Sequence, residues 1–325
     1  MKSIPKLSNK IEEGNIFEVI NKNFSKLAPA YYTLVTNWLI RSYSEYNNID
    51  KFIILIYLIN KELILIRKNR LIIDYDTFYK DKSLEILKIK ISDISRDLLI
   101  PRESIRRKIE ALEKEGVIKK TGKKIFIERS GFITAQANKT LEEFSILVSK
   151  FSEILSSEKI SNRVFDVNEI SKSIKENFSF CWYQFYKFLF IFTNRWKTDT
   201  KTLDLETICI GLIILVNTVQ NKSFKKKDLE RVKYLKEVQK TDQIGMNAFS
   251  IADITGIPRA TVVRKLEFLL ENKFIKIDKN KLYSFSVNTK SKQFNVIKKL
   301  QDKNMKSLSI FLYKVFNQIN LVNAN

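Results

Sequence analysis

The segments IPRESIRRKIEALEKEG (residues 100–116) and IPRATVVRKLEFLLENK (residues 257–273) are two versions of one pattern within a single chain. Sliding the sequence against itself by 157 residues, the difference between positions 257 and 100, aligns them without a gap and places Arg107 on Arg264. The same offset places LIYLIN (residues 55–60) on LIILVN (residues 212–217), and the tripeptide NFS at Asn23 recurs at Asn177 with a small shift. Two copies of a unit of about 157 residues are therefore the simplest account of the chain.

Each copy of the pattern predicts two short helices separated by a turn and followed by a hairpin. In the first copy, apolar residues recur at helical spacing up to Leu98 and again after Pro101, which disfavours helix at the residue before it and suits the first turn of the next helix. The second helix ends at Gly116, and VIKKTGKKIFIE then alternates like two strands joined by a glycine-containing turn. The second copy predicts helices over 250–255 and 258–271, followed by the hairpin FIKIDKNKLYSFSV.

Both copies resemble the winged helix-turn-helix family, in the phrases DISRDLLIPRESIRRKIEALEKEGVIKK and SIADITGIPRATVVRKLEFLLENKFIKI. Long helical stretches flank them: FSKLAPAYYTLVTNWLI and FSFCWYQFYKFLFIF precede the two copies, and TLEEFSILVSKFSEIL and MKSLSIFLYKVFNQI follow them. Such bracketing helices are similar to those of the MarR group of bacterial regulators, where they form the dimer interface. The resemblance implies a mainly α fold with small β-hairpin wings, in which two tandem winged-helix units flank a shared helical core.

The duplication also predicts where the units begin and end. The first repeat covers residues 1–157, with a winged helix over about 50–131 and a connecting helix over about 138–157. The second repeat covers residues 158–325, with an aromatic-rich helix over about 170–196, a winged helix over about 203–287 and a C-terminal helix over about 292–321.

Composition favours a polyanionic partner and argues against catalysis. The chain has 58 Lys and Arg against 36 Asp and Glu, a formal charge of +22, although a Lys-, Ile- and Asn-rich composition also follows from A/T-rich codons, so the placement of the charges must decide. It has no histidine, the commonest general base and metal ligand. The stretch GVIKKTGKK from Gly116 has five residues between its glycines rather than four and lacks Ser or Thr after Lys123, so it does not fit a phosphate-binding loop. We therefore expect no enzyme, no cofactor and no metal.

The remaining features indicate a cytoplasmic, nucleoid-associated protein with no membrane partner. Its two cysteines, Cys181 and Cys209, stand among apolar residues and are expected to be buried and reduced. The N-terminal residues lack the apolar core of a secretory signal, and the apolar run FIILIYLINKELILI is broken by Lys61 and Glu62.

The second helix of each copy carries the candidate DNA contacts. Setting Ile105, Ile109 and Leu112 inward turns Glu103 and Arg107 outward, and an arginine fork can read guanine O6 and N7. The candidates on these helices are Arg102, Glu103, Ser104, Arg106, Arg107, Arg259, Thr261 and Arg264, and those on the wings are Lys119, Lys120, Lys123, Lys124, Lys276, Lys279 and Lys281. The competing interpretation is that Glu103–Arg107 and Arg106–Glu110 are solvated ion pairs worth about 0.2–0.5 kcal/mol each, and that the hairpin tips are ordinary charged turns.

These residues predict a sequence-specific double-stranded DNA-binding transcriptional regulator that reads an imperfect palindrome, with half-sites about one helical turn (~34 Å) or a multiple apart. A duplicated chain is compatible with a monomer that acts as a pseudo-dimer. Two alternatives stay open: a plasmid-type replication initiator with tandem winged helices, and a structural subunit that binds a protein partner. An effector is unassigned, because the aromatic cluster around α-helical residues 182–188 is compatible with a pocket and with an interface core; its members are Trp182, Tyr183, Phe185, Tyr186 and Phe188.

Overall fold

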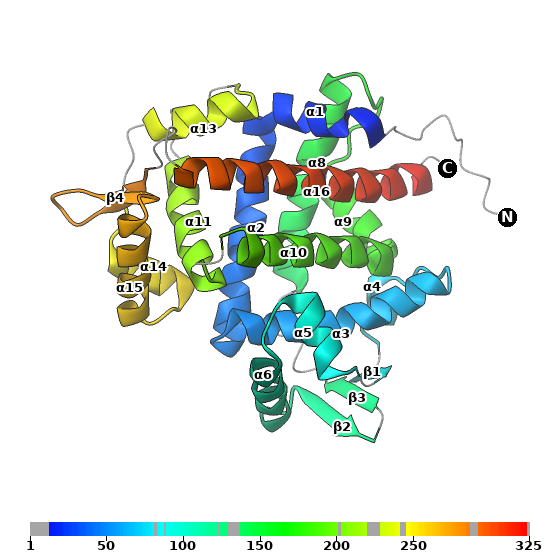
Figure 1. The fold of residues 1–325 in the computed structure, drawn as a ribbon. Coiled ribbons are helices and arrows are strands. Elements are labelled where there is room, and N and C mark those ends of the chain that lie inside the picture. Colours follow the sequence, from blue (N-terminus) through cyan, green and yellow to red (C-terminus); the bar gives the residue numbers. More distant parts are fainter. Residues whose placement is uncertain are drawn as a thin grey trace.

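The computed structural model describes residues 13–80, 83–87, 89–122, 124–128, 137–200, 203–219, 228–240, 245–286 and 292–323. The chain is mainly helical with small antiparallel sheets, as expected, and Figure 1 shows long helices crossing at the centre with two peripheral groups of short helices and strands. Among the described residues no single helix is long and apolar enough to span a membrane. Helices α10 (Phe178–Thr200) and α11 (Leu205–Val219) together have the length and composition but are bent by 103°.

The described part of the first half starts at the short 3₁₀ helix η2 (Glu13–Asn15). Its further elements are α1 (Ile16–Lys22), α2 (Phe24–Tyr46), α3 (Ile49–Lys68), α4 (Tyr75–Phe78), β1 (Ser83–Leu87), α5 (Ile91–Leu98), α6 (Arg102–Lys114), β2 (Ile118–Thr121), β3 (Lys124–Glu128) and α8 (Ala137–Ser157). The strands form an antiparallel sheet in the order β1-β3-β2, which pairs Ile86 with Ile125 and Ile118 with Ile127. Strand β1 was not predicted, because the hairpin alone was expected from the sequence.

The second half repeats this order. Its elements are α9 (Val167–Glu176), α10 (Phe178–Thr200), α11 (Leu205–Val219), α13 (Arg231–Lys240), α14 (Ala248–Thr255), α15 (Arg259–Glu271), β4 (Ile275–Ile277), β5 (Tyr283–Phe285) and α16 (Lys292–Val322). The bounds of α14 and α15 are those of α5 and α6 shifted by 157 residues, from 91 to 248 and from 102 to 259. An isolated bridge between Met246 and Tyr283 takes the place that β1 has in the first half.

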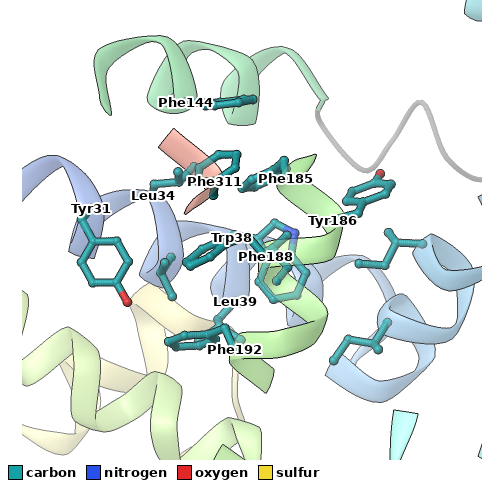
Figure 2. Close-up of a cluster of buried hydrophobic side chains, with 14 of the residues drawn as sticks. Tyr31, Leu34, Trp38, Leu39, Phe144, Phe185, Tyr186, Phe188, Phe192 and Phe311 are labelled. Atoms are coloured by element: carbon teal, nitrogen blue, oxygen red, sulfur yellow. The ribbon is translucent and has the colours of Figure 1, made fainter. Parts of the chain in front are cut away.

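The two halves pack reciprocally. Helix α2 lies against α11 of the other half, and α10 lies against α3; likewise α1 packs on α16 and α9 on α8. Side chains from both halves share one hydrophobic core, in which Phe144 of α8 contacts Phe185 of α10 at 5.3 Å between ring centroids and Phe188 stacks on Phe311 of α16 at 5.2 Å (Figure 2). Burying this apolar surface requires helices from both halves.

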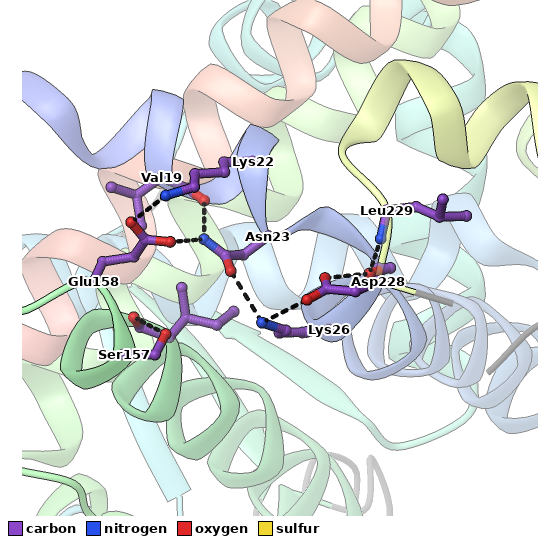
Figure 3. A network of polar contacts seen from close by, with 10 residues as sticks. Val19, Lys22, Asn23, Lys26, Ser157, Glu158, Asp228 and Leu229 are labelled. Carbon is purple, nitrogen blue, oxygen red and sulfur yellow. Dashed lines mark hydrogen bonds and ion pairs between the residues drawn. The ribbon is translucent and has the colours of Figure 1, made fainter. Parts of the chain in front are cut away.

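The asparagine of each NFS tripeptide ends one helix, and its side chain anchors the start of the next helix to another part of the chain. Asn23 donates from its side chain to the Val19 carbonyl at 3.2 Å and to Glu158 at 2.8 Å, which ties the α1–α2 junction to the end of α8 (Figure 3). Asn177 donates to the Ser173 carbonyl at 3.0 Å and accepts a hydrogen bond from Gln318 of α16. The single helix expected over about 170–196 is therefore wrong: Asn177 separates α9 from α10.

The serine of each NFS tripeptide forms hydrogen bonds with the backbone of the other half of the chain. Ser25 exchanges two hydrogen bonds with Leu229, its N–H donating to the Leu229 carbonyl at 3.1 Å and its hydroxyl accepting from the Leu229 N–H at 2.9 Å. Ser179 makes the same pair of bonds with Ile73, both at 2.9 Å. We call these two matched contacts the cross-unit clamps, because each joins the start of a long helix to the segment after α3 or α11 of the other half.

Candidate nucleic-acid interface

Helices α6 and α15, the candidate recognition helices, each follow a proline and turn an apolar face inward. Pro101 and Pro258 stand at the N-cap position with extended backbone, so the helices begin at Arg102 and Arg259. Their inward residues are buried, which confirms the predicted helix faces: Ile105, Ile109 and Leu112 in α6, and Val262, Leu266 and Leu269 in α15. In Figure 1, α6 lies at the lower edge of the molecule and α15 at the left edge, on adjacent sides of the helical body.

On α6, a row of ion pairs occupies the outward face. Arg106 donates to both carboxylate oxygens of Glu103, at 2.7 Å and 3.0 Å, and to Glu110 at 2.7 Å. The hydrogen bonds and charge of Glu103 raise the pKa of Arg106 above its usual value, and Arg106 in turn lowers the pKa of Glu103. Arg107 reaches Glu103 only at 4.0 Å, and 69% of its side chain is exposed. Of these two arginines, Arg107 is therefore the better placed to bind an external acceptor.

On α15, the corresponding face carries no such row. Ala260 and Val263 stand where α6 has Glu103 and Arg106. Arg259 and Arg264 are exposed, and neither guanidinium has an ion pair within the part of the chain that the structure describes. Lys265 is instead paired with Asp204, just before α11, and so fixes α15 to its own half. Ser104 of α6 and Thr261 of α15 are half-buried at matching positions.

The two wings differ in the same way as the two helices: ion pairs occupy lysines of the first wing but not those of the second, among the residues described. In the first, Lys120 pairs with Glu113 at 2.7 Å and Lys124 with Glu85 of β1 at 2.6 Å, while Lys119 is exposed and Lys123 lies outside the described residues. In the second, three lysines are exposed around a turn in which the Asp278 side chain accepts from two backbone N–H groups, at 2.8 Å and 2.9 Å; they are Lys276, Lys279 and Lys281. None of these three has an ion pair among the residues described.

Helix α10 of the second half positions the first helix pair. The Asn194 side chain donates to the Asp97 carbonyl at 2.8 Å, and Lys197 pairs with Asp50 at 3.0 Å and reaches the Leu98 carbonyl at 3.4 Å. Asp97 and Leu98 lie at the end of α5, directly before the turn that leads into α6. Sequence reasoning missed these anchoring residues, although Thr193-Asn194 matches Thr36-Asn37 in the duplication.

The aromatic cluster of α10 lies mostly in the interface between the halves. Trp182, Phe185 and Tyr186 are buried and leave a cavity of only about 20 Å³ with residues of α2 and α3. Tyr183 is half-buried under the Arg67 guanidinium, 4.6 Å from the ring centroid. These contacts favour the interface-core interpretation of the cluster over a ligand pocket.

A larger apolar pocket, of about 80 Å³, lies in the second half between α11, α15, β5 and α16, with Leu212, Leu269, Phe285 and Ile297 among its walls. Both cysteines are buried and unpaired with each other, and burial raises the pKa of each thiol, so neither is an activated nucleophile. In the described ranges, no group of three His, Cys, Asp or Glu side chains is placed to hold a metal ion.

Comparisons of the chain with protein-family models, with curated proteins and with solved structures found no match.

Proposed function

We propose that the chain is a sequence-specific double-stranded DNA-binding protein that regulates transcription, with α6 and α15 as its recognition helices. In this proposal each half contains a winged helix. The order α3, β1, α5, α6, β2, β3, with only the one-turn helix α4 between α3 and β1, supports this assignment, as does the pairing of β1 with β3. The second half keeps the order from α11 to β5, with the Met246–Tyr283 bridge in place of the first strand.

The observation that carries the proposal is the matched pair Arg107 and Arg264. Each lies one turn into a helix that follows a tight turn, each is exposed, and each is carried by one half of a duplicated framework. An arginine there can form a bidentate contact with guanine O6 and N7 in the major groove, and Arg102 and Arg259 at the helix starts suit phosphates. The excess of 22 positive charges supports a polyanionic ligand.

The reciprocal packing supports two half-sites at a fixed separation. Because α10 holds α5 and α2 packs on α11, neither recognition helix can move far without disturbing the other half. The two heads would then dock on related half-sites as a two-fold dimer does, with the chain as a pseudo-dimer. A protein bound across two such sites would block polymerase by occupying its path.

The test is a selection of bound duplexes from a random DNA pool with the wild type, Arg107→Ala and Arg264→Ala, and Lys299→Ala of α16 as an exposed-charge control. We expect an imperfect palindrome, with each arginine variant relaxing a different half at a cost of about 1–3 kcal/mol. The control should keep both halves. Direct repeats would favour a replication initiator instead, and the absence of any enriched sequence would contradict the proposal and leave a partner-binding subunit.

A further inference from the structure

The two candidate recognition helices differ in chemistry at one outward position of the first turn. Glu103 of α6 corresponds to Ala260 of α15 under the 157-residue shift, while the arginines one turn later, Arg107 and Arg264, are the same. Both positions are exposed, so neither residue is required by the core. A difference at this place changes what the helix presents to a base edge without changing how the helix packs.

Glu103 is held in place by its neighbour. The Arg106 fork binds both of its carboxylate oxygens, at 2.7 Å and 3.0 Å, and Glu110 fixes the far side of the same guanidinium at 2.7 Å. A carboxylate has about four acceptor positions, and the fork occupies two of them. With 60% of its side chain exposed, Glu103 therefore keeps acceptor capacity that is open to solvent.

The same contacts lower the electrostatic cost of a carboxylate near DNA. An isolated carboxylate would be repelled by the phosphates, but Glu103 and Glu110 lie beside Arg106 and Arg107, and the four charges cancel. In the major groove the base donor that a carboxylate recognises is the N4 amino group of cytosine. Glu103 is thus suited to a C·G pair next to the guanine that Arg107 reads.

Ala260 presents the opposite chemistry. It has no polar group, and Val263 stands where Arg106 would hold a carboxylate. A methyl side chain at a base edge favours the C5-methyl group of thymine. The same position on the two helices therefore selects different bases.

We propose that the Glu103/Ala260 position sets the difference between the two half-sites, with Glu103 specifying cytosine and Ala260 thymine beside a shared guanine. This inference rests on the proposed function and adds to it a residue that decides the orientation of the protein on its site. Copying alanine onto α6, or glutamate together with its arginine partner onto α15, should make the site symmetric.

The experiment is the same duplex selection with Glu103→Ala, the double variant Ala260→Glu/Val263→Arg and the wild type, followed by measured affinities for the selected sites. Wild type should select an unequal pair of half-sites. Glu103→Ala should select thymine at this position in both halves. The double variant Ala260→Glu/Val263→Arg, which also supplies the arginine that holds the carboxylate on α6, should select cytosine in the half that α15 reads. Each preference should be worth at least about fivefold in affinity, the lower end of a good base contact.

These substitutions are compatible with the fold, because alanine and arginine are good helix formers, Val263 is only half-buried, and a glutamate in the first turn favours the helix dipole. Circular dichroism and melting curves of the variants should match those of the wild type. If the wild type selects no sequence, the proposed function fails. If it selects a palindrome but Glu103→Ala leaves every position unchanged, the function stands, this inference is wrong, and Glu103 is only a solvated partner of Arg106.

Discussion

Glu206 is a carboxyl group whose surroundings in the folded chain disfavour its ionised form. It lies in the first turn of α11, beside a cavity also lined by Asp50 of α3 and Lys197 of α10. Burial raises its pKa, the carboxylates of Asp204 and Asp50 raise it further, and Lys265 opposes the shift. The folded chain therefore holds the Glu206 proton more tightly than the unfolded chain does.

We expect Glu206→Gln to raise the free energy of unfolding at pH 7. A carboxyl whose pKa is higher in the folded state destabilises the fold at pH values above that pKa, and the penalty disappears as the pH falls through its folded pKa and the group is protonated in both states. The gain from the neutral amide should therefore shrink between pH 7 and pH 4. Urea unfolding at both pH values measures it, with the exposed Glu271→Gln as control. A destabilised variant at pH 7 would contradict the burial argument.

At the scale of elements, the turn between the two helices of each pair places a different residue type in the left-handed conformation in the two halves. Leu99 ends α5 with φ of 54°, in the left-handed region, and the corresponding residue after α14 is Gly256 with φ of 69°. A side chain in that region costs about 1–2 kcal/mol per residue, whereas glycine adopts it freely. The first turn thus keeps a backbone strain that the second turn avoids.

Exchanging these residues should change stability in opposite directions. Leu99→Gly should raise the free energy of unfolding by about 0.5–1 kcal/mol, because relief of the left-handed backbone exceeds the extra chain entropy of glycine. Gly256→Ala should lower it by about 1 kcal/mol or more. Denaturant midpoints of the two variants give the answer. A loss of stability in Leu99→Gly would mean that the half-exposed Leu99 side chain contributes more through packing than its backbone costs.

The sequence predicted those elements that are determined by nearby residues. Pro101, Pro258 and the apolar spacing around them located the starts of α6 and α15 to within a residue, whereas α6 ends two residues before the predicted Gly116. Strand β1 was missed because a short run such as SLEIL becomes a strand only by pairing with β3, some forty positions later in the chain. The break at Asn177 was missed because apolar residues continue through it at helical spacing, while α9 ends by a change in the Asn177 backbone that its side chain supports with a hydrogen bond to the Ser173 carbonyl.

The same division applies to the candidate interface. The outward positions of α6 and α15 follow from helical geometry and were predicted correctly, as was the i,i+4 pair of Arg106 and Glu110 as a competing interpretation. The neutralisation of Lys124 was not predictable, because its partner Glu85 belongs to the unforeseen strand. The local spacing of apolar residues therefore determines which face of a helix a side chain lies on. Its ion-pair partners depend on contacts with residues distant in the sequence.

At the scale of the whole molecule, the cross-unit clamps and the reciprocal helix packing make each half depend on the other. A half on its own would lose many of the contacts that stabilise its helices. The hydroxyl of Ser179 is the partner of the Ile73 N–H, and that of Ser25 is the partner of the Leu229 N–H. Each clamp thus fixes a segment of one half on the first turn of a helix from the other.

We expect the chain to unfold in one transition. Tryptophan fluorescence reports on both halves, through Trp38 in α2 and Trp182 and Trp196 in α10, and should coincide with far-UV circular dichroism along a urea titration. Ser179→Ala should lower the free energy of unfolding by about 1–3 kcal/mol, since it leaves the Ile73 N–H without its partner, and should leave the transition single. Ser44→Ala, at an exposed site on α2, is the matched control. Two separated transitions would show that the halves fold independently.

The covalent connection between α8 and α9 affects how the occupancy of a binding site depends on protein concentration. A regulator assembled from two separate chains dissociates on dilution, so occupancy of its site falls more steeply than its concentration. Here residues 158–166 join the halves covalently, and the local concentration of one half around the other does not depend on how many molecules a cell contains. If the proposed function holds, site occupancy would rise with the first power of protein concentration.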